Sequence, residues 1–105
     1  MIVYEVNIDV REDAYADYHA WLEGHVDEML ALPGFVSAEI MQRLEPSATR
    51  GTRALTVHYR LTDEAASRAY ITEHAARMRE DGLRRFGDAF TATRRVLASG
   101  ATRNA

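Results

Sequence analysis

Four segments of the chain alternate between apolar and polar residues, the pattern of a β-strand with one buried face. In the first segment every even-numbered position from Ile2 to Val10 is apolar. In the second, the alternation puts Val36, Ala38 and Ile40 on the face opposite Phe35. The four predicted strands are residues 2–10, 35–44, 53–61 and 89–97.

Two longer segments change to helical spacing, in which apolar residues recur every three or four positions. The first runs from Glu12 to about Leu32 and ends at Pro33-Gly34, because proline cannot continue a helix and glycine turns the chain. Thr62 suits the N-cap of the second, which extends to about Gly82 or Phe86. The apolar stripe predicted for this second helix consists of Tyr70, Ile71, His74, Ala75 and Met78.

The order of predicted elements is β-α-β-β-α-β, with each helix joining two strands. Two right-handed crossovers in this order give a ferredoxin-like α+β sandwich, in which a four-stranded antiparallel sheet carries both helices on one face. The pattern predicts a single domain over residues 1–97 and a loose tail of small and polar residues over 98–105.

A sandwich of this kind leaves one face of its sheet without helices. The apolar sides of residues 2–10 and 53–61 should lie under the helices. The opposite, mixed side carries Glu5, Asn7 and His58, and should face solvent or a second copy of the chain. We therefore expect a homodimer with an isologous interface.

Composition excludes several functional classes. The chain of 105 residues has no cysteine, so disulfides, thiolate chemistry and cysteine-based metal sites are absent. Its net charge of −3 is unfavourable for a nucleic-acid partner. No apolar run approaches the roughly 18 residues that cross a membrane, and the first residues do not form a signal peptide. We expect a cytoplasmic globular protein.

No motif for metal or phosphate binding is found, and neither a metal nor a cofactor is expected. His19 and His25 are six residues apart, which places them on different sides of a helix. The doublets Arg84-Arg85 and Arg94-Arg95 have acidic neighbours, so we expect them to be solvated or to complement helix dipoles.

The segments MIVYEVN, AWLEGHVDEMLALPGF and EHAARMREDGLRRFGDAF, followed by RRVL, resemble a family of short bacterial proteins known only as a domain of unknown function. The resemblance extends from Met1 to about Leu97. Through its fold this family resembles the dimeric α+β barrel superfamily, in which two ferredoxin-like subunits place their sheets together. That superfamily includes antibiotic-biosynthesis monooxygenases, haem-degrading monooxygenases, muconolactone-type isomerases and stress-induced barrel proteins. The resemblance implies a homodimer and no particular reaction.

His74 is the first candidate for a functional side chain. It follows Tyr70 and precedes Met78 by four positions each, so its ring borders the predicted buried stripe. A partly buried imidazole favours its neutral form, which can act as an acid–base group or a ligand. We predict that any ligand pocket touches His74, with Asn7, His58 or Tyr70 as neighbours. The alternative is a structural His74 that supports the core.

Trp21 and His25 form a second candidate group. They are four residues apart on the first helix, so they can form an aromatic–imidazole pair that either covers the edge of the core or forms a pocket wall. His58 has a structural alternative too, an ion pair with Glu5 on the neighbouring strand.

The site residues of the haem-degrading relatives can be compared with this sequence. They use an asparagine on the first strand, a tryptophan, and a histidine on the second helix that binds iron. Asn7 and His74 match two of these positions, but the only tryptophan, Trp21, belongs to the first helix. The resemblance therefore argues against haem degradation.

Three classes of function remain. The first is a dimer that binds a small aromatic or apolar molecule between sheet and helices, as an enzyme of the cofactor-free monooxygenase or isomerase type. The second is a non-catalytic binding or stress-associated module, and the third is a purely structural dimer. The face of the sheet that meets the helices discriminates among them. Asn7, Glu5 and His58 under the helices near His74 would favour the first two. The same face turned toward a partner subunit would leave His74 among apolar residues and favour the third.

Overall fold

A computed structural model describes all residues from 1 to 105 and contains one four-stranded sheet. Its strands are β1 (Ile2–Arg11), β2 (Phe35–Gln42), β3 (Thr52–Leu61) and β4 (Phe90–Ala98). They lie in the order β2-β3-β1-β4, and each neighbouring pair is antiparallel. This order, with β1 and β3 central, confirms the predicted ferredoxin-like topology.

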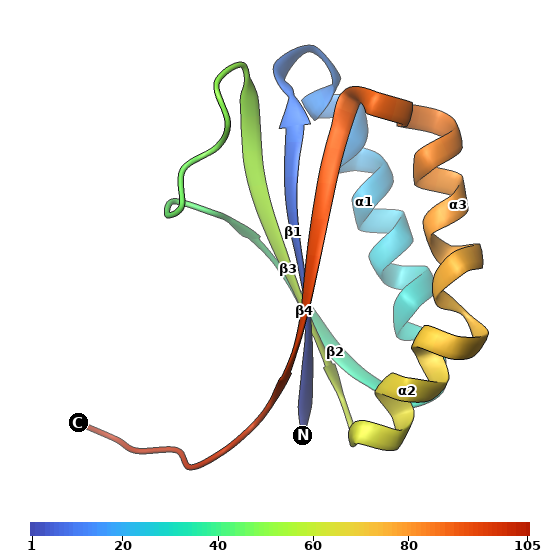
Figure 1. Cartoon of the computed structure of the whole chain (residues 1–105), viewed down its shortest axis with the longest axis vertical. Coiled ribbons are helices and arrows are strands. Elements are labelled where there is room, and N and C mark those ends of the chain that lie inside the picture. The colour runs from blue at the N-terminus through green and yellow to red at the C-terminus, as the bar shows by residue number, and fades with distance from the viewer.

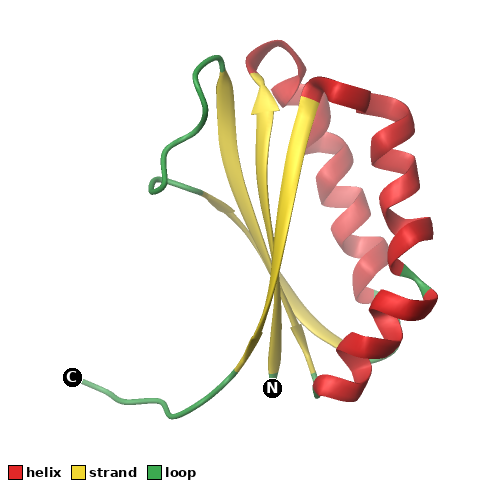
Figure 2. Ribbon diagram, viewed as in Figure 1, coloured by secondary structure: helices red, strands yellow, loops and turns green.

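All helices lie on one face of this sheet (Figures 1 and 2). A short 3₁₀ turn, η1 (Glu12–Ala14), leads into α1 (Tyr15–Leu30). After β3 come α2 (Glu64–Glu73), α3 (Ala75–Phe86) and a second 3₁₀ turn, η2 (Gly87–Ala89). None of these helices combines the length and the apolar character needed to span a bilayer.

The apolar face of the sheet is the one under the helices, as the alternation predicts. Tyr4 pairs with Tyr59 and Ile8 with Leu55 across β1 and β3, and all four side chains are buried. From α1, the core receives the residues spaced three or four apart along one side: Tyr18, Leu22, Val26 and Met29. We call this side of the sheet the inner face and the opposite side the outer face.

The second helix differs from the prediction, because it is interrupted at His74. His74 has φ −127° and ψ −28°, outside the helical region, and it ends α2 and begins α3. The chain bends there (Figure 1), so the predicted stripe is not continuous across the break. Ile71, which we expected in the stripe, is 46% exposed.

Two local features also correct the prediction. The N-cap of α2 is Asp63 rather than Thr62, because the Asp63 carboxylate accepts a hydrogen bond of 2.8 Å from the backbone N–H of Ala66. In β2 a bulge between Phe35 and Ser37 shifts the register against β3. Phe35 consequently faces the core with Ala38, while Val36 is exposed.

The turn before β2 requires glycine. Gly34 has φ +83°, and a Cβ at this position would lie 2.5 Å from the Cβ of Ala66 on α2. Its carbonyl also accepts a hydrogen bond of 3.0 Å from the Thr62 N–H. Gly34 therefore allows the end of the first crossover to pack directly against the start of the second.

The last residues leave the sheet. The N–H of Ser99 donates a hydrogen bond of 2.8 Å to the carbonyl of Met1, and residues 99–105 have no helix or strand. In Figure 1 they extend away from the helices.

Candidate functional site

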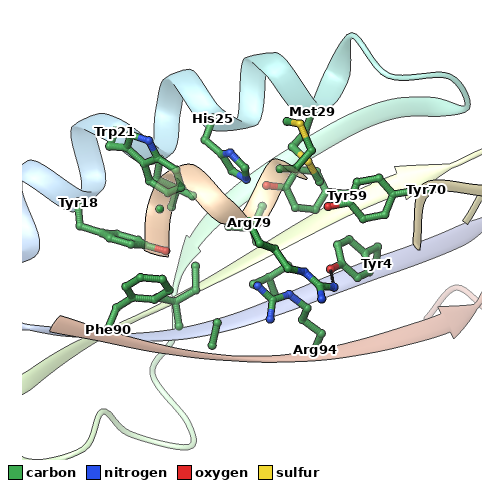
Figure 3. A pocket seen from close by; sticks show the side chains of 17 residues that line it. Tyr4, Tyr18, Trp21, His25, Met29, Tyr59, Tyr70, Arg79, Phe90 and Arg94 are labelled. Atoms are coloured by element: carbon green, nitrogen blue, oxygen red, sulfur yellow. Dashed lines mark hydrogen bonds between the residues drawn. The ribbon is translucent and has the colours of Figure 1, made fainter. Parts of the chain in front are cut away.

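An interior cavity lies between the inner face of the sheet and helices α1 and α3 (Figure 3). Seventeen residues line it, thirteen of them hydrophobic, and none is an aspartate or a glutamate. The polar groups on its wall belong to four tyrosines, one histidine and two arginines: Tyr4, Tyr18, Tyr59, Tyr70, His25, Arg79 and Arg94.

The aromatic side chains form two groups within the cavity. Tyr18 packs against Trp21 and Phe90, with ring centroids 5.5 and 5.0 Å away. In the other group Tyr4 lies 5.9 Å from Tyr59 and 5.3 Å from Tyr70. Figure 3 shows these groups at opposite ends of the cavity, with His25 between them. The walls are therefore largely flat ring surfaces.

Trp21 fixes the position of α1 against α3. Its Nε1–H donates a hydrogen bond of 2.8 Å to the Asp81 carboxylate. The indole also lies directly on Gly82, where a Cβ would be 2.8 Å from the ring. Any side chain at position 82 would displace the indole.

His25 is held by packing alone. Its ring stacks on Trp21 at 4.6 Å with an interplanar angle of 18°, and it makes no hydrogen bond to another residue. Burial lowers the pKa of His25, although Glu28 and Asp81 oppose the shift. The ring is thus neutral at physiological pH and has nitrogen atoms free to accept or donate a proton.

Burial also keeps the tyrosines of the cavity neutral. Desolvation raises the pKa of Tyr18, Tyr59 and Tyr70 well above the usual value. The Tyr4 hydroxyl accepts a hydrogen bond of 2.8 Å from Arg79. Neutral hydroxyl groups both donate and accept hydrogen bonds, so they suit a polar substituent on an otherwise apolar ligand.

Arg79 and Arg94 are the two arginines of the cavity, and neither forms an ion pair with a carboxylate. Arg79 comes from α3, and its Nε is buried without a hydrogen-bond partner. Arg94 comes from β4, opposite Val6 of β1, a register position on the inner face. Both arginines line the same cavity, from different elements.

The enclosed part of the cavity is small. Its volume is about 40 Å³. The empty volume is about 470 Å³ when the space open to solvent at the mouth is included. The enclosed part has room for one or a few water molecules. The side chains at the mouth must therefore move before an organic molecule can enter.

Asn7 and His58 lie on the outer face, away from this cavity. They belong to a network around Glu5, which is 5% exposed. Asn7 Nδ2 donates to Glu5 Oε2 at 2.9 Å, His58 Nε2 is 2.8 Å from Oε1, and Arg95 Nε donates to Oε2 at 2.6 Å. Thr56 Oγ1 completes it with a hydrogen bond of 2.7 Å to Asn7 Oδ1.

This network borders an open groove of about 710 Å³ on the outer face. Only two of the fourteen residues that line the groove are hydrophobic. At its other end Asp9 is bonded to Arg43 and accepts a hydrogen bond of 2.7 Å from Thr49 Oγ1. The charged groups of the groove thus satisfy one another, unlike Arg79 in the interior cavity.

His74 lines neither the interior cavity nor the outer groove. Its Nδ1 is 2.8 Å from Arg77 Nη2 and its Nε2 is 3.9 Å from Glu73, both on the exposed side of the helix break. Of the predicted site residues, the structure brings together Tyr70, His25 and Trp21 in one cavity and places Asn7, His58 and His74 elsewhere.

The same geometry bears on the comparison of Asn7 and His74 with the residues of haem-degrading proteins. Asn7 is on the outer face, whereas His74 is at the junction of α2 and α3 beyond the inner face, so they cannot contact one ligand. No three histidine, aspartate or glutamate side chains are grouped so that they could hold a metal ion.

The sequence interpretation missed Tyr4, Tyr59, Arg79 and Arg94 as site residues. Both residues of the doublet Arg94-Arg95 are exposed, as expected, but Arg94 also borders the cavity, and Arg95 binds Glu5 on the other face. For Arg94 the sequence contained one signal, the alternation of β4. Arg94 is on the same face of the strand as Phe90 and Ala92, which pack against the core. Arg79 likewise follows Ala75 by four positions on the buried side of α3.

The chain matches a family described as "Domain of unknown function (DUF4286)" over residues 1–99, as the sequence resemblance indicates. No curated protein matches it. Its fold is found in solved structures of low identity. One, from Deinococcus radiodurans and provisionally described as an antibiotic biosynthesis monooxygenase, has a TM-score of 0.74 at 11% identity, over 100% of this chain and 98% of that chain.

Two further structures have the same fold. SnoaB, a cofactor-independent oxygenase from Streptomyces nogalater, has a TM-score of 0.66 at 17% identity, over 96% of this chain and 95% of its own. Rv0793 from Mycobacterium tuberculosis has a TM-score of 0.63 at 18% identity, over 99% and 100% of the two chains. At these identities the likeness establishes the ferredoxin-like fold and leaves the reaction open.

Proposed function

The chain belongs to the DUF4286 family, and we propose that it binds a small planar organic molecule between its sheet and helices. We further propose that it acts on this molecule as a cofactor-independent enzyme of the monooxygenase or isomerase type. The observation that carries the proposal is the interior cavity, in which tyrosine, tryptophan and phenylalanine rings surround a neutral histidine.

The chemistry available in this cavity is proton transfer in a dry environment. Neutral His25 can take a proton from a hydroxyl or an activated carbon of a bound aromatic molecule. The neutral hydroxyls of Tyr59 and Tyr70 can donate hydrogen bonds to the anion that forms. In the monooxygenase version molecular oxygen is the oxidant. The fold it shares with SnoaB, a cofactor-independent oxygenase, supports this version.

A second copy of the chain is part of the proposal. The outer face has no helices over it, and Glu5 there is covered by the side chains that bond to it. A partner sheet on this face would complete a second layer without disturbing the interior cavity, which lies on the other side of the sheet. In this arrangement each subunit has its own site.

Ligand binding can be tested by filling the cavity. Ala92 lies on the floor of the cavity, so Ala92→Leu adds three carbon atoms inside it. Ala76→Leu adds the same atoms to the exposed side of α3 and serves as the control. With 2-naphthol as the probe, we expect a rise in melting temperature and quenching of Trp21 fluorescence in the wild type and in Ala76→Leu, and neither in Ala92→Leu.

Equal responses of all three proteins to 2-naphthol would contradict a site in the cavity. Catalysis is tested separately, with an oxygen electrode and hydroxylated naphthalenes in the presence of a metal chelator. We expect oxygen uptake by the wild type that is lost in His25→Leu. Binding without oxygen uptake or isomerisation would favour the non-catalytic alternative, in which the same cavity only holds its ligand.

A further inference from the structure

We propose that the ligand of the interior cavity carries a carboxylate, bound by Arg79 and Arg94, on an aromatic body that lies among the tyrosines. This inference rests on the proposed function, because it names the class of molecule that the same cavity takes. It starts from the guanidinium of Arg79, whose Nε is buried and lacks any acceptor.

A buried donor without an acceptor is unusual, since leaving it unpaired costs about 1–3 kcal/mol. The side chain of Arg79 is not loosely placed, because its Nη2 donates a hydrogen bond of 2.8 Å to the Tyr4 hydroxyl. This bond fixes the plane of the guanidinium and hence the direction of the unpaired Nε–H. An acceptor supplied from outside the chain would satisfy it.

Arg94 makes a negatively charged acceptor the favourable one. It lines the same cavity as Arg79, and no aspartate or glutamate does. The chain as a whole has a net charge of −3, and the two arginines that line the outer groove are paired with carboxylates, Arg95 with Glu5 and Arg43 with Asp9. Two unneutralised guanidiniums at one cavity therefore form a local positive site in an acidic protein.

The shape of the surroundings points to a flat carboxylate on an aromatic ring. Guanidinium groups bind carboxylates through parallel hydrogen bonds in one plane. Figure 3 shows Arg79 and Arg94 between the two aromatic groups of the cavity, with Arg79 joined to Tyr4. Beyond the arginines the wall consists mainly of ring faces and of Met29 and Met78, which suit an aromatic body and offer no further charge.

The burial of the two arginines sets the orientation of the ligand. Arg94 is exposed, so it lies toward the mouth of the cavity, whereas the Nε of Arg79 is buried. The carboxylate would bind between the two arginines while the aromatic body lies among the rings. The long side chain of Arg94 can swing outward, which provides the opening that the small enclosed volume requires.

The test is a series of three probes with the same ring system and different charge: 2-naphthoate, 2-naphthalenemethanol and 2-naphthylmethylamine. Binding to the full chain is measured by calorimetry at neutral pH and low salt. We expect 2-naphthoate to bind at least about tenfold more tightly than the alcohol, since a charge-assisted hydrogen bond contributes about 1.5–3 kcal/mol. The amine should bind most weakly.

Variants assign this preference to the two arginines. Arg79→Gln and Arg94→Gln should each reduce the affinity for 2-naphthoate about tenfold and leave the affinity for the alcohol within about twofold. Arg77→Gln is the control, because Arg77 lies on the same helix and contacts His74 and the sulfur of Met78 without lining the cavity itself. Circular dichroism and melting temperature show whether each variant is folded.

The outcomes separate this inference from the proposed function. If the alcohol binds as tightly as the carboxylate, and the arginine variants change neither affinity, the cavity binds aromatic molecules but the carboxylate inference is wrong. If none of the three probes binds, the proposed function itself is contradicted. If 2-naphthoate binds tightly but equally well to Arg79→Gln, Arg94→Gln and Arg77→Gln, the anion site lies elsewhere.

Discussion

At the scale of single residues, charge is distributed very differently on the two faces of the sheet. On the outer face Glu5 is surrounded by donors, and the Arg95 hydrogen bond, with His58 and Asn7, outweighs the effect of burial. Together they lower its pKa from 4.5 to about 2. On the inner face Arg79 has an unpaired donor and no carboxylate. Glu5 on the outer face is thus paired within the chain, whereas Arg79 on the inner face keeps a donor without a partner.

The lowered pKa of Glu5 predicts how stability depends on pH. Between about pH 4.5 and pH 2 the folded protein binds fewer protons at Glu5 than the unfolded chain does, so stability falls as the pH falls through this range. Above about pH 4.5, Glu5 contributes fully to the stability of the folded protein. Glu5→Gln should therefore be less stable than the wild type at neutral pH and show a weaker loss toward pH 2. Urea unfolding at several pH values measures both effects.

Glu80→Gln is the matched control for this prediction. Glu80 is exposed on α3 and forms no ion pair, so its removal should preserve the wild-type pH dependence. If Glu5→Gln and the wild type lose stability in parallel over this range, the network around Glu5 does not stabilise its ionised form.

The residue scale also shows where sequence interpretation is weakest. The Trp21–His25 pair could be expected from spacing alone, because residues four apart on a helix are neighbours. Arg94 could not be assigned with the same ease, since a charged residue in an alternating strand is usually taken as solvated. Its parity with Phe90 and Ala92 was the only signal, and the pairing of β4 with β1 places it opposite Val6 on the inner face.

At the scale of elements, the junctions on either side of α2 decide how α3 lies over the sheet. α2 begins at the Asp63 cap and ends at His74, where the backbone leaves the helical conformation. This break allows α3 to place Met78, Arg79 and Gly82 toward the cavity. The start of α2 also packs against Gly34 at the end of the first crossover.

The cap of α2 gives a prediction at this scale. Asp63→Ala removes the acceptor for the Ala66 N–H and should lower the free energy of unfolding by about 0.5–2 kcal/mol. Asp63→Asn keeps a side-chain oxygen at the same position and should cost much less. Thr62→Ala tests the original assignment, and a larger loss there than in Asp63→Ala would show that Thr62 is the cap after all. Urea unfolding provides the measurement.

The elements themselves could largely be predicted, and the reason is periodicity. The strands alternate and α1 repeats every three or four residues, so their existence and order follow from burial on one face. The break at His74 could not be found in this way, because the segment around it contains neither glycine nor proline. The bulge at Val36 was hidden for a related reason: one extra residue reverses the parity without changing the composition.

At the scale of the whole molecule, the sheet separates two faces to which we assign different roles. The inner face and the helices enclose the proposed ligand site, and the outer face is left for a second copy (Figure 2). Glu5, Asn7 and His58 lie on the outer face and not under the helices, an outcome that by the sequence criterion favours a purely structural dimer. The polar groups of the cavity come instead from tyrosines, His25 and arginines.

The proposed dimer gives the prediction at this scale. Light scattering should give a mass of twice the 11.8 kDa of one chain at micromolar concentration. Thr93→Arg places a charge in the outer groove and should yield a folded monomer, whereas Glu80→Arg on the exposed side of α3 should remain dimeric. A wild-type monomer, or a dimer disrupted only by Glu80→Arg, would rule out the outer face as the interface.

The central claim is that an aromatic ligand binds between the sheet and helices α1 and α3, and NMR tests it most directly. Trp21 is the only tryptophan, so its indole N–H gives a single resolved signal at the cavity wall. The methyl groups of Met29 and Met78 report on the same cavity, and that of Met41 reports on the outer groove. On titration with 2-naphthoate, we predict that the signals of Trp21, Met29 and Met78 shift together with one dissociation constant while the Met41 signal stays unchanged. Shifts confined to Met41 and its neighbours on the outer face would contradict the account.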